Sequence, residues 1–316
     1  MKISKLKSLR WRLIKKPIGL VFSHEYNLSL AARDTHKTFD SMKYKKIRDL
    51  LIAKNLLSRK KILIPKYISY QDLELVHTPA FLKKIKDPLY VAKALNLESL
   101  DPWDSYVLEY FRIMTGGTIL ATEFALDNYS VAFNLGGGFH HAHADKAAAY
   151  CLINDVAVAI EKFRKERRFN RPMIIDLDYH EGDGNLIFYK DDPNVYTFSI
   201  HASDWVNIDK ENNTDIVLPD NCDGVEYLRI LKQELPLAWR KFKPDIIFYI
   251  AGSDPYEKDL IGDLNLTRIE MLERNMFVYN RINESMIPAI IVAGGGYGPD
   301  SWQIYYDFLE KVLSSR

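Results

Sequence analysis

The side chains best suited to chemistry gather in two short segments, residues 176–184 and 251–254. Asp178 and His180 are two residues apart, so on an extended segment both side chains point to one side and can share a cation. Asp254 can complete the set from another part of the chain. Three protein ligands leave at least one coordination position open for water or a substrate oxygen, which is typical of a catalytic metal site.

A cation held in this way needs a separate general base. Two aspartates already neutralise a divalent cation, so bound water is acidified less than it is by three neutral histidine ligands. His140 and His141, which follow the glycine run 136–138, are the candidates for this base, unless they are ordinary loop residues. Asp176 and Asp183 can each orient one imidazole. Two His–Asp pairs beside one metal indicate metal-assisted hydrolysis.

Tyr297 follows a second glycine run, residues 294–296. A flexible turn can bring its hydroxyl to an oxyanion opposite the metal, whereas a packed core tyrosine is the simpler alternative. The ligand set has two oxygens and one nitrogen, so it suits Zn²⁺, Fe²⁺ or Co²⁺ and leaves the identity of the metal open.

Short apolar segments precede these residues and predict the strands that position them. Segments that are apolar throughout are typical of strands buried on both faces, and stretches with helical spacing lie between them. This alternation predicts an α/β fold, a single doubly wound and mainly parallel sheet with ligands at the carboxyl ends of the strands. The expected strands are 18–23, 131–135, 173–177, 195–200, 246–251 and 289–293, and the expected helices are 41–55, 106–126, 147–166, 225–242, 267–282 and 301–313.

The composition narrows the class of protein. The chain has 316 residues, of which 47% are hydrophobic and 27% charged, which excludes disordered, fibrous and membrane proteins. Its net charge of +1 creates no field that would gather nucleic acid, so we expect no direct nucleic-acid binding. We find no apolar run long enough for a transmembrane segment. Cys151 and Cys222 lie too far apart in the sequence for a disulfide framework or a zinc knuckle.

The start of the chain differs from the rest. Residues 1–16 hold seven basic residues and no acidic one, and we expect a basic N-terminal extension followed by one catalytic domain over 17–316. The apolar run 18–22 is too short for a signal peptide, so we expect a cytoplasmic protein. Abundant Lys, Ile and Asn point to a bacterial source. The extension is either a solvated lead-in to the first strand or a membrane-surface segment, and the first is favoured. The sequence predicts no oligomeric state.

From about Pro17 onward the sequence resembles the zinc-dependent histone deacetylase family, which has an arginase-like α/β fold. The resemblance implies a hydrolase that removes acetyl or longer fatty acyl groups from lysine side chains. Its most specific segments are 136–141, 176–184, 251–254 and 294–297, whereas 39–44, 76–78 and 115–118 are most similar to class IV members and their bacterial relatives.

The resemblance also implies a role for each matched residue. The Zn²⁺ ligands would be Asp178, His180 and Asp254. His141, paired with Asp183, would be the general base, and His140, paired with Asp176, would be an electrostatic or general-acid partner. Tyr297 would polarise the scissile carbonyl. The substrate tunnel would be lined by Gly138, Phe139, Trp205 and Gly295, and a structural K⁺ would bind Ser199 and main-chain oxygens of Asp176, Asp178, His180 and Ile200.

Departures from the family pattern leave the acyl preference open. Alanines at 147–149 stand where class IV relatives carry glycines beside the foot of the tunnel, and their methyl groups can narrow a pocket for long acyl chains. Lys258 replaces a glycine common after the third ligand, and Asp183 replaces the asparagine of some class IV members.

Three other functions remain as alternatives. A deacylase of small amines such as acetylpolyamines is the first, because a protein without a basic partner surface need not act on histones. An arginase-type ureohydrolase is less favoured, since its two-metal motif requires an aspartate where this chain has Gly182. A non-catalytic acyl-lysine binder would need neither the His–Asp pairs nor Tyr297.

Overall fold

The structure is a computed structural model that describes residues 16–27, 40, 42–97, 106–202, 205–206, 208 and 211–315. The expected basic extension, apart from Lys16, lies outside these residues. Phe39 and Ser41 of the segment compared with class IV proteins also lie outside them.

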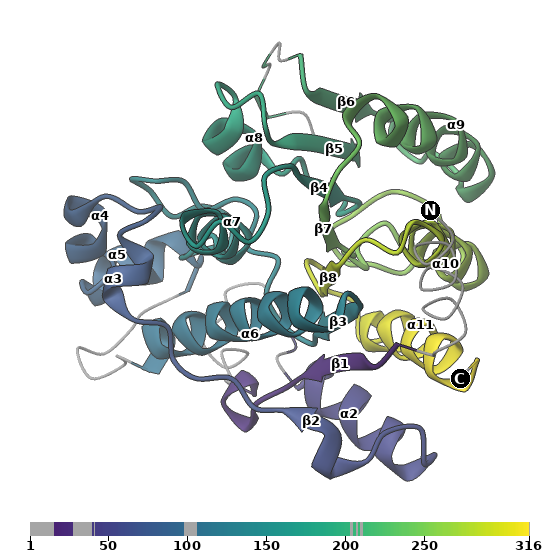
Figure 1. The fold of residues 1–316 in the computed structure, drawn as a ribbon, viewed down its shortest axis with the longest axis horizontal. Coiled ribbons are helices and arrows are strands. Elements are labelled where there is room, and N and C mark those ends of the chain that lie inside the picture. The colour runs from purple at the N-terminus through teal and green to yellow at the C-terminus, as the bar shows by residue number, and fades with distance from the viewer. Residues whose placement is uncertain are drawn as a thin grey trace, which may run out of the picture.

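Eight strands form one sheet in the order β2-β1-β3-β8-β7-β4-β5-β6 (Figure 1). Every neighbouring pair is parallel. This sheet confirms the predicted α/β fold class. The strands are β1 (Ile18–Val21), β2 (Ile62–Leu63), β3 (Val131–Asn134), β4 (Pro172–Asp176), β5 (Tyr196–His201), β6 (Asn213–Val217), β7 (Ile246–Ile250) and β8 (Ala289–Val292).

Helices cover both faces of the sheet (Figure 1). Helices α6, α7 and α8 lie on one side, and α9, α10 and α11 lie on the other, with α2 packed against α11. The longer helices are α2 (Lys43–Ala53), α6 (Tyr106–Asn128), α7 (Asp155–Lys165), α9 (Gly224–Phe242), α10 (Arg268–Ser285) and α11 (Ser301–Ser314). The short ones are α3 (Tyr70–Leu73), α4 (Pro79–Lys84), α5 (Pro88–Ala94), α8 (Asp183–Tyr189) and the 3₁₀ turns η1 (His24–Tyr26) and η2 (Arg59–Lys61).

The central strands explain why the apolar pattern predicted the sheet. Every residue of β3, β4, β5, β7 and β8 is buried, because helices pack on both faces. The edge strands β2 and β6 were not expected. Strand β6 has the sequence Asn-Thr-Asp-Ile-Val and is mostly half-buried, so it carries no apolar run.

The helix predicted over 147–166 is wrong for residues 147–154, because α7 begins only at Asp155. The Asn154 side chain accepts the N–H of Ala157 and so caps the helix. Before it, Ala148 and Cys151 exchange backbone hydrogen bonds in a tight turn. Ala149 has φ 41°, a left-handed conformation that excludes a helix there and that glycine adopts at less cost.

The parallel arrangement brings the carboxyl ends of all eight strands to one edge of the sheet. The loops after β3, β4, β7 and β8 therefore meet there, and they carry the residues singled out by the sequence. Across the described ranges, no helix combines the length and the apolar character needed to cross a bilayer.

Candidate active site

Asp178, His180 and Asp254 meet at the carboxyl edge of the sheet. Nδ1 of His180 lies 3.2 Å from Oδ1 of Asp178 and 3.3 Å from Oδ2 of Asp254. Ligand atoms around a tetrahedral cation with bonds of 2.0–2.1 Å are about 3.3 Å apart, so these distances fit a shared ion. Oδ2 of Asp254 is buried and accepts no hydrogen bond from any described residue. Because an unpaired buried carboxylate oxygen is costly, the three side chains fit a divalent cation.

The other carboxylate oxygens are held by backbone groups. The N–H of Gly295 donates to Oδ2 of Asp178 at 2.7 Å, and the N–H of Tyr179 donates to Oδ1 of Asp254 at 3.0 Å. A Cβ at Gly295 would lie 2.2 Å from Oδ2 of Asp254. This close approach explains why a glycine is needed at Gly295.

The two adjacent histidines each contact one aspartate. Nδ1 of His140 lies 2.8 Å from Oδ2 of Asp176, and Nδ1 of His141 lies 2.7 Å from Oδ1 of Asp183. Burial lowers the pKa of His140, but Asp176 and Asp178 outweigh it and raise that pKa to about 9 in the metal-free protein. Burial and the charge of His140 lower the pKa of His141 to about 3. Near neutral pH the pair therefore holds one positive charge and one neutral imidazole.

A third histidine, which the sequence reasoning missed, shares the same aspartate. Nε2 of His143 lies 2.7 Å from Oδ2 of Asp183, so one carboxylate serves both His141 and His143. Burial raises the pKa of Asp183, but these two hydrogen bonds outweigh it and hold the pKa far below its usual range. The available signal was the third histidine in the run His-His-Ala-His.

A fourth histidine, His77, forms hydrogen bonds to the backbone next to this group. Its Nδ1–H donates to the carbonyl of His143 at 2.9 Å, and its Nε2 accepts the N–H of Asn154 at 3.2 Å. The ring is therefore neutral, with both nitrogens engaged. It is 1% exposed, and this burial lowers its pKa to about 4 against the opposing effect of backbone hydrogen bonds.

We expect His77 to make the fold sensitive to acid. Its pKa is lower in the folded chain than in the unfolded chain, where it is about 6.5, so the unfolded chain takes up the proton first. The stabilisation is complete above pH 6.5 and declines as pH falls toward 4, by about 3 kcal/mol. Urea unfolding of the wild type and His77→Gln between pH 6.5 and 4 measures this. The variant should lose less stability on acidification, and equal losses would contradict the assignment.

The glycine loop before His140 is fixed by Asp155, the first residue of α7. Its carboxylate accepts the N–H of Phe139 at 2.8 Å and that of Gly138 at 3.0 Å, and it also accepts the hydroxyl of Thr118. Gly138 has φ 87°. Asp155 was not singled out by the sequence because it contacts the loop only in the folded chain.

Tyr297 lies beside His180, one of the candidate metal ligands. Its ring is perpendicular to that of His180, with the centroids 6.3 Å apart. The turn that carries it is held on two sides, since its N–H donates to Oδ2 of Asp259 at 2.8 Å and the buried Lys43 ammonium donates to the carbonyl of Gly296 at 3.1 Å. Burial, with the negative charges of nearby aspartates, raises the pKa of the Tyr297 hydroxyl well above its ordinary value. The hydroxyl therefore keeps its proton and can donate a hydrogen bond.

The two aromatic tunnel candidates occupy different surroundings. Trp205 is 43% exposed and stacks on His141, with the ring centroids 4.3 Å apart and an interplanar angle of 19°. Phe139 is largely buried and packs against Phe111 at a centroid distance of 4.7 Å. Trp205 thus covers the candidate base, while the role of Phe139 as a tunnel wall stays a prediction.

Ser199 is the expected side-chain ligand of the potassium ion. Strands β4 and β5 pair Asp176 with Ser199, so the serine side chain is next to the main chain that leads to the metal ligands. Its hydroxyl oxygen is buried and has no hydrogen-bond partner among the described residues. An unpartnered oxygen at this place fits a nearby ion.

One buried arginine contacts both loops that carry the candidate metal ligands. Arg274 on α10 donates from Nη1 to the carbonyl of Leu177 at 2.8 Å and from Nη2 to the carbonyl of Gly252 at 2.7 Å. Leu177 directly precedes Asp178, and Gly252 lies two residues before Asp254. The guanidinium thereby sets the distance between the two loops. Arg274 lies in the buried stripe of α10 with Met271 and Val278. Because arginine is mostly exposed in proteins, the sequence did not single it out.

Comparisons with known proteins agree with this architecture. Histone deacetylase 2 of Arabidopsis thaliana is 28% identical over 310 residues, covering 93% of this chain and 78% of that protein. An uncharacterized protein of Picosynechococcus sp. is 31% identical over 269 residues, covering 85% of this chain and 89% of that protein. The acetoin utilization protein AcuC of Staphylococcus aureus is 26% identical over 305 residues, covering 88% and 78%.

The chain is also similar to a solved structure and to a domain family. The crystal structure of a histone deacetylase homologue from Aquifex aeolicus superimposes with a TM-score of 0.77 at 24% identity, covering 95% of this chain and 85% of that one, and so shares its fold. The histone deacetylase domain matches residues 37–309. The chain therefore belongs to the histone deacetylase family of hydrolases, whose activity is the deacetylation of acyl-amides.

Proposed function

We propose that the protein is a metal-dependent amidohydrolase that removes acyl groups from the side-chain amine of lysine. The observation that carries this proposal is the arrangement of a base and a proton donor around the three ligands. His180 has the ring of His141 at 5.7 Å and the ring of Tyr297 at 6.3 Å, both in edge contact. This arrangement supports attack on a carbonyl between the two groups.

Asp178, His180 and Asp254 would hold the cation, for which Zn²⁺ is proposed, with Fe²⁺ and Co²⁺ compatible with the same donors. When bound, a divalent cation polarises an acyl carbonyl and lowers the pKa of water. The unpaired Oδ2 of Asp254 supports its presence.

His141 would take the proton of the attacking water. Its Nδ1 is engaged by Asp183, which leaves Nε2 to accept the proton. The Tyr297 hydroxyl would donate a hydrogen bond to the carbonyl oxygen as negative charge develops there. The histidine pair then returns a proton to the leaving amine. Water and amide are thus converted to a carboxylic acid and a free amine.

The proposed catalytic domain spans residues 17–316. It includes the residues expected to line the substrate tunnel and to bind potassium. Gly138, Phe139, Trp205 and Gly295 would surround the acyl-lysine chain. A structural K⁺ would be held by Ser199, whose unpartnered hydroxyl supports this assignment, and by main-chain oxygens of Asp176, Asp178, His180 and Ile200.

The test is hydrolysis of fluorogenic lysine peptides carrying acyl chains from acetyl to myristoyl. Metal-free protein should be inactive, and Zn²⁺, Fe²⁺ or Co²⁺ should restore turnover. Shorter chains should be preferred if the alanines at 147–149 narrow the pocket. Acetylpolyamines form a separate arm, and activity on them alone would replace the lysine substrate. Absence of turnover on every substrate, with the metal bound, would contradict the proposal.

A further inference from the structure

A second group of metal-ligating side chains lies next to the first and has no part in the chemistry above. Glu181, His201 and Asp215 each place one potential ligand atom within 4.8 Å of the other two. We propose that these three side chains bind a second divalent cation of the zinc and cobalt type. None of the three belongs to the catalytic ligand set or to the expected potassium site.

The sheet register explains why the three side chains converge. Strands β5 and β6 pair Ser199 with Asp215, and His201 lies two residues beyond Ser199, so Asp215 and His201 leave the same face of the sheet. Glu181 reaches this face from the loop between β4 and α8.

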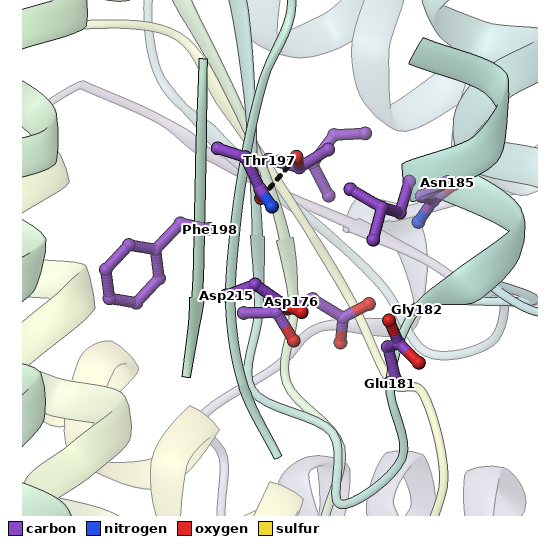
Figure 2. Close-up of a pocket in the computed structure, with 11 residues that line it drawn as sticks. Asp176, Glu181, Gly182, Asn185, Thr197, Phe198 and Asp215 are labelled. Atoms are coloured by element: carbon purple, nitrogen blue, oxygen red, sulfur yellow. Dashed lines mark hydrogen bonds between the residues drawn. The ribbon is translucent and has the colours of Figure 1, made fainter. Parts of the chain in front are cut away.

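A small cavity opens at this face. Figure 2 shows the carboxylates of Asp176, Glu181 and Asp215 gathered at one end of it. Ser199 and Asp176 of the expected potassium site also line this cavity, whereas His201 does not, so the cavity lies between the two sites. Its volume is about 10 Å³, roughly the space of one water molecule or ion. The Asp176 carboxylate already contacts Nδ1 of His140, so Glu181 and Asp215 are the carboxylates available to a cation.

Glu181 provides the observation that points to a ligand. Its Oε2 accepts the backbone N–H groups of Trp205 and Val206. Its Oε1 is buried and accepts no hydrogen bond from the described residues. Among the buried side-chain atoms of the described residues that lack a partner, two are carboxylate oxygens, Oε1 of Glu181 and Oδ2 of Asp254. Each of these oxygens belongs to one of the two candidate metal groups, so both groups contain a buried carboxylate oxygen that lacks a hydrogen-bond donor.

One ligand separation and the balance of charge agree with a cation. Nε2 of His201 lies 3.1 Å from Oδ1 of Asp215, close to the separation of about 3.3 Å expected for two ligands of one tetrahedral ion. Two carboxylates neutralise a divalent cation, and an imidazole ligand favours Zn²⁺ or Co²⁺ over Mg²⁺ or Ca²⁺. The Asp215 side chain is 20% exposed, which gives an ion a route from solvent. The competing arrangement is a protonated His201 between the two carboxylates, without metal.

The second cation would also act on the catalytic site. Glu181 holds the backbone of Trp205, and the indole of Trp205 stacks on His141. A cation that fixes the Glu181 carboxylate therefore fixes the segment that covers the candidate base.

Metal counting tests the proposal without any substrate. Chelator-treated protein is dialysed against excess Co²⁺ at constant K⁺, freed of unbound ion and measured by mass spectrometry. We expect two ions per chain in the wild type, one in Asp215→Asn, one in Asp254→Asn and none in the double variant. One ion in the wild type, or two in Asp215→Asn, would overturn the second site. Circular dichroism verifies that each variant is folded.

A fluorescence titration gives an independent measurement. In the Asp254→Asn background, Co²⁺ should quench tryptophan emission through Trp205, and the added change Asp215→Asn or Trp205→Phe should remove that quenching. Unaltered emission would contradict the site. Neither experiment depends on catalysis, so an inactive protein that binds two ions would refute only the proposed function, and an active one that binds a single ion would refute only this inference.

Discussion

Replacing Tyr297 with Phe is expected to lower kcat on acyl-lysine peptides by about 10²–10³-fold, because the variant loses one hydrogen-bond donor to the developing oxyanion. The ring and its edge contact with His180 are retained, so the change removes the hydroxyl alone. KM should change little, since the donor acts mainly in the transition state. Steady-state kinetics with the metal-loaded variant measure both constants.

Tyr150→Phe is the matched control for this experiment. Its ring lies 6.0 Å from that of Tyr297, so the same type of change is made on a neighbouring tyrosine. The control should keep its kcat within a few-fold of the wild type. If Tyr297→Phe behaved like the control while binding its full complement of metal, the proposed oxyanion role would be wrong.

Asp254→Asn is expected to lower the affinity for the catalytic metal by more than about 10²-fold and to abolish hydrolysis at stoichiometric metal. An amide is a weaker ligand than a carboxylate, and the change removes half of the negative charge that the two aspartates supply. Isothermal titration with Zn²⁺ measures the affinity. Asp263→Asn is the matched control, because Asp263 lies in the same loop and accepts the Tyr179 hydroxyl at 2.9 Å.

The stability of the metal-free protein separates loss of a ligand from misfolding. Burial and the charge of Asp178 raise the pKa of Asp254 to about 7, so at pH 8 the ionised side chain is held unfavourably in the metal-free fold. Metal-free Asp254→Asn should therefore unfold at a temperature no lower than that of the metal-free wild type. A marked drop would show that the variant loses metal because its fold is damaged.

The sequence predicted the central sheet because burial on both faces leaves an unmistakable apolar pattern. Strand β7 reads Ile-Ile-Phe-Tyr-Ile, and all five residues are buried. The same reasoning missed β6, whose residues are held by pairing with β5 and carry polar side chains. It also began α7 too early, because periodicity over 147–154 does not show that Asn154 caps the helix and that the preceding turn has left-handed residues.

The sequence likewise predicted some residues of the candidate site and missed others. The sequence placed the ligands and both His–Asp pairs in loops that the structure brings to one edge of the sheet, and their catalytic roles remain predictions. His143 was missed although the run His-His-Ala-His carried a signal for it, whereas nothing in the sequence singled out Asp155 or Arg274. These residues act on segments up to 97 positions away in the chain, at distances that follow only from the packing of helices on the sheet.

Arg274 also bears on the order in which the candidate site is completed during synthesis. All three candidate ligands are translated before α10, yet the guanidinium that contacts their loops is on that helix. A nascent chain that ends before α10 would carry the ligands without the spacing that matches one ion. Metal loading should therefore follow release of a nearly complete chain, and prematurely terminated fragments should compete poorly for the cell's limited supply of metal.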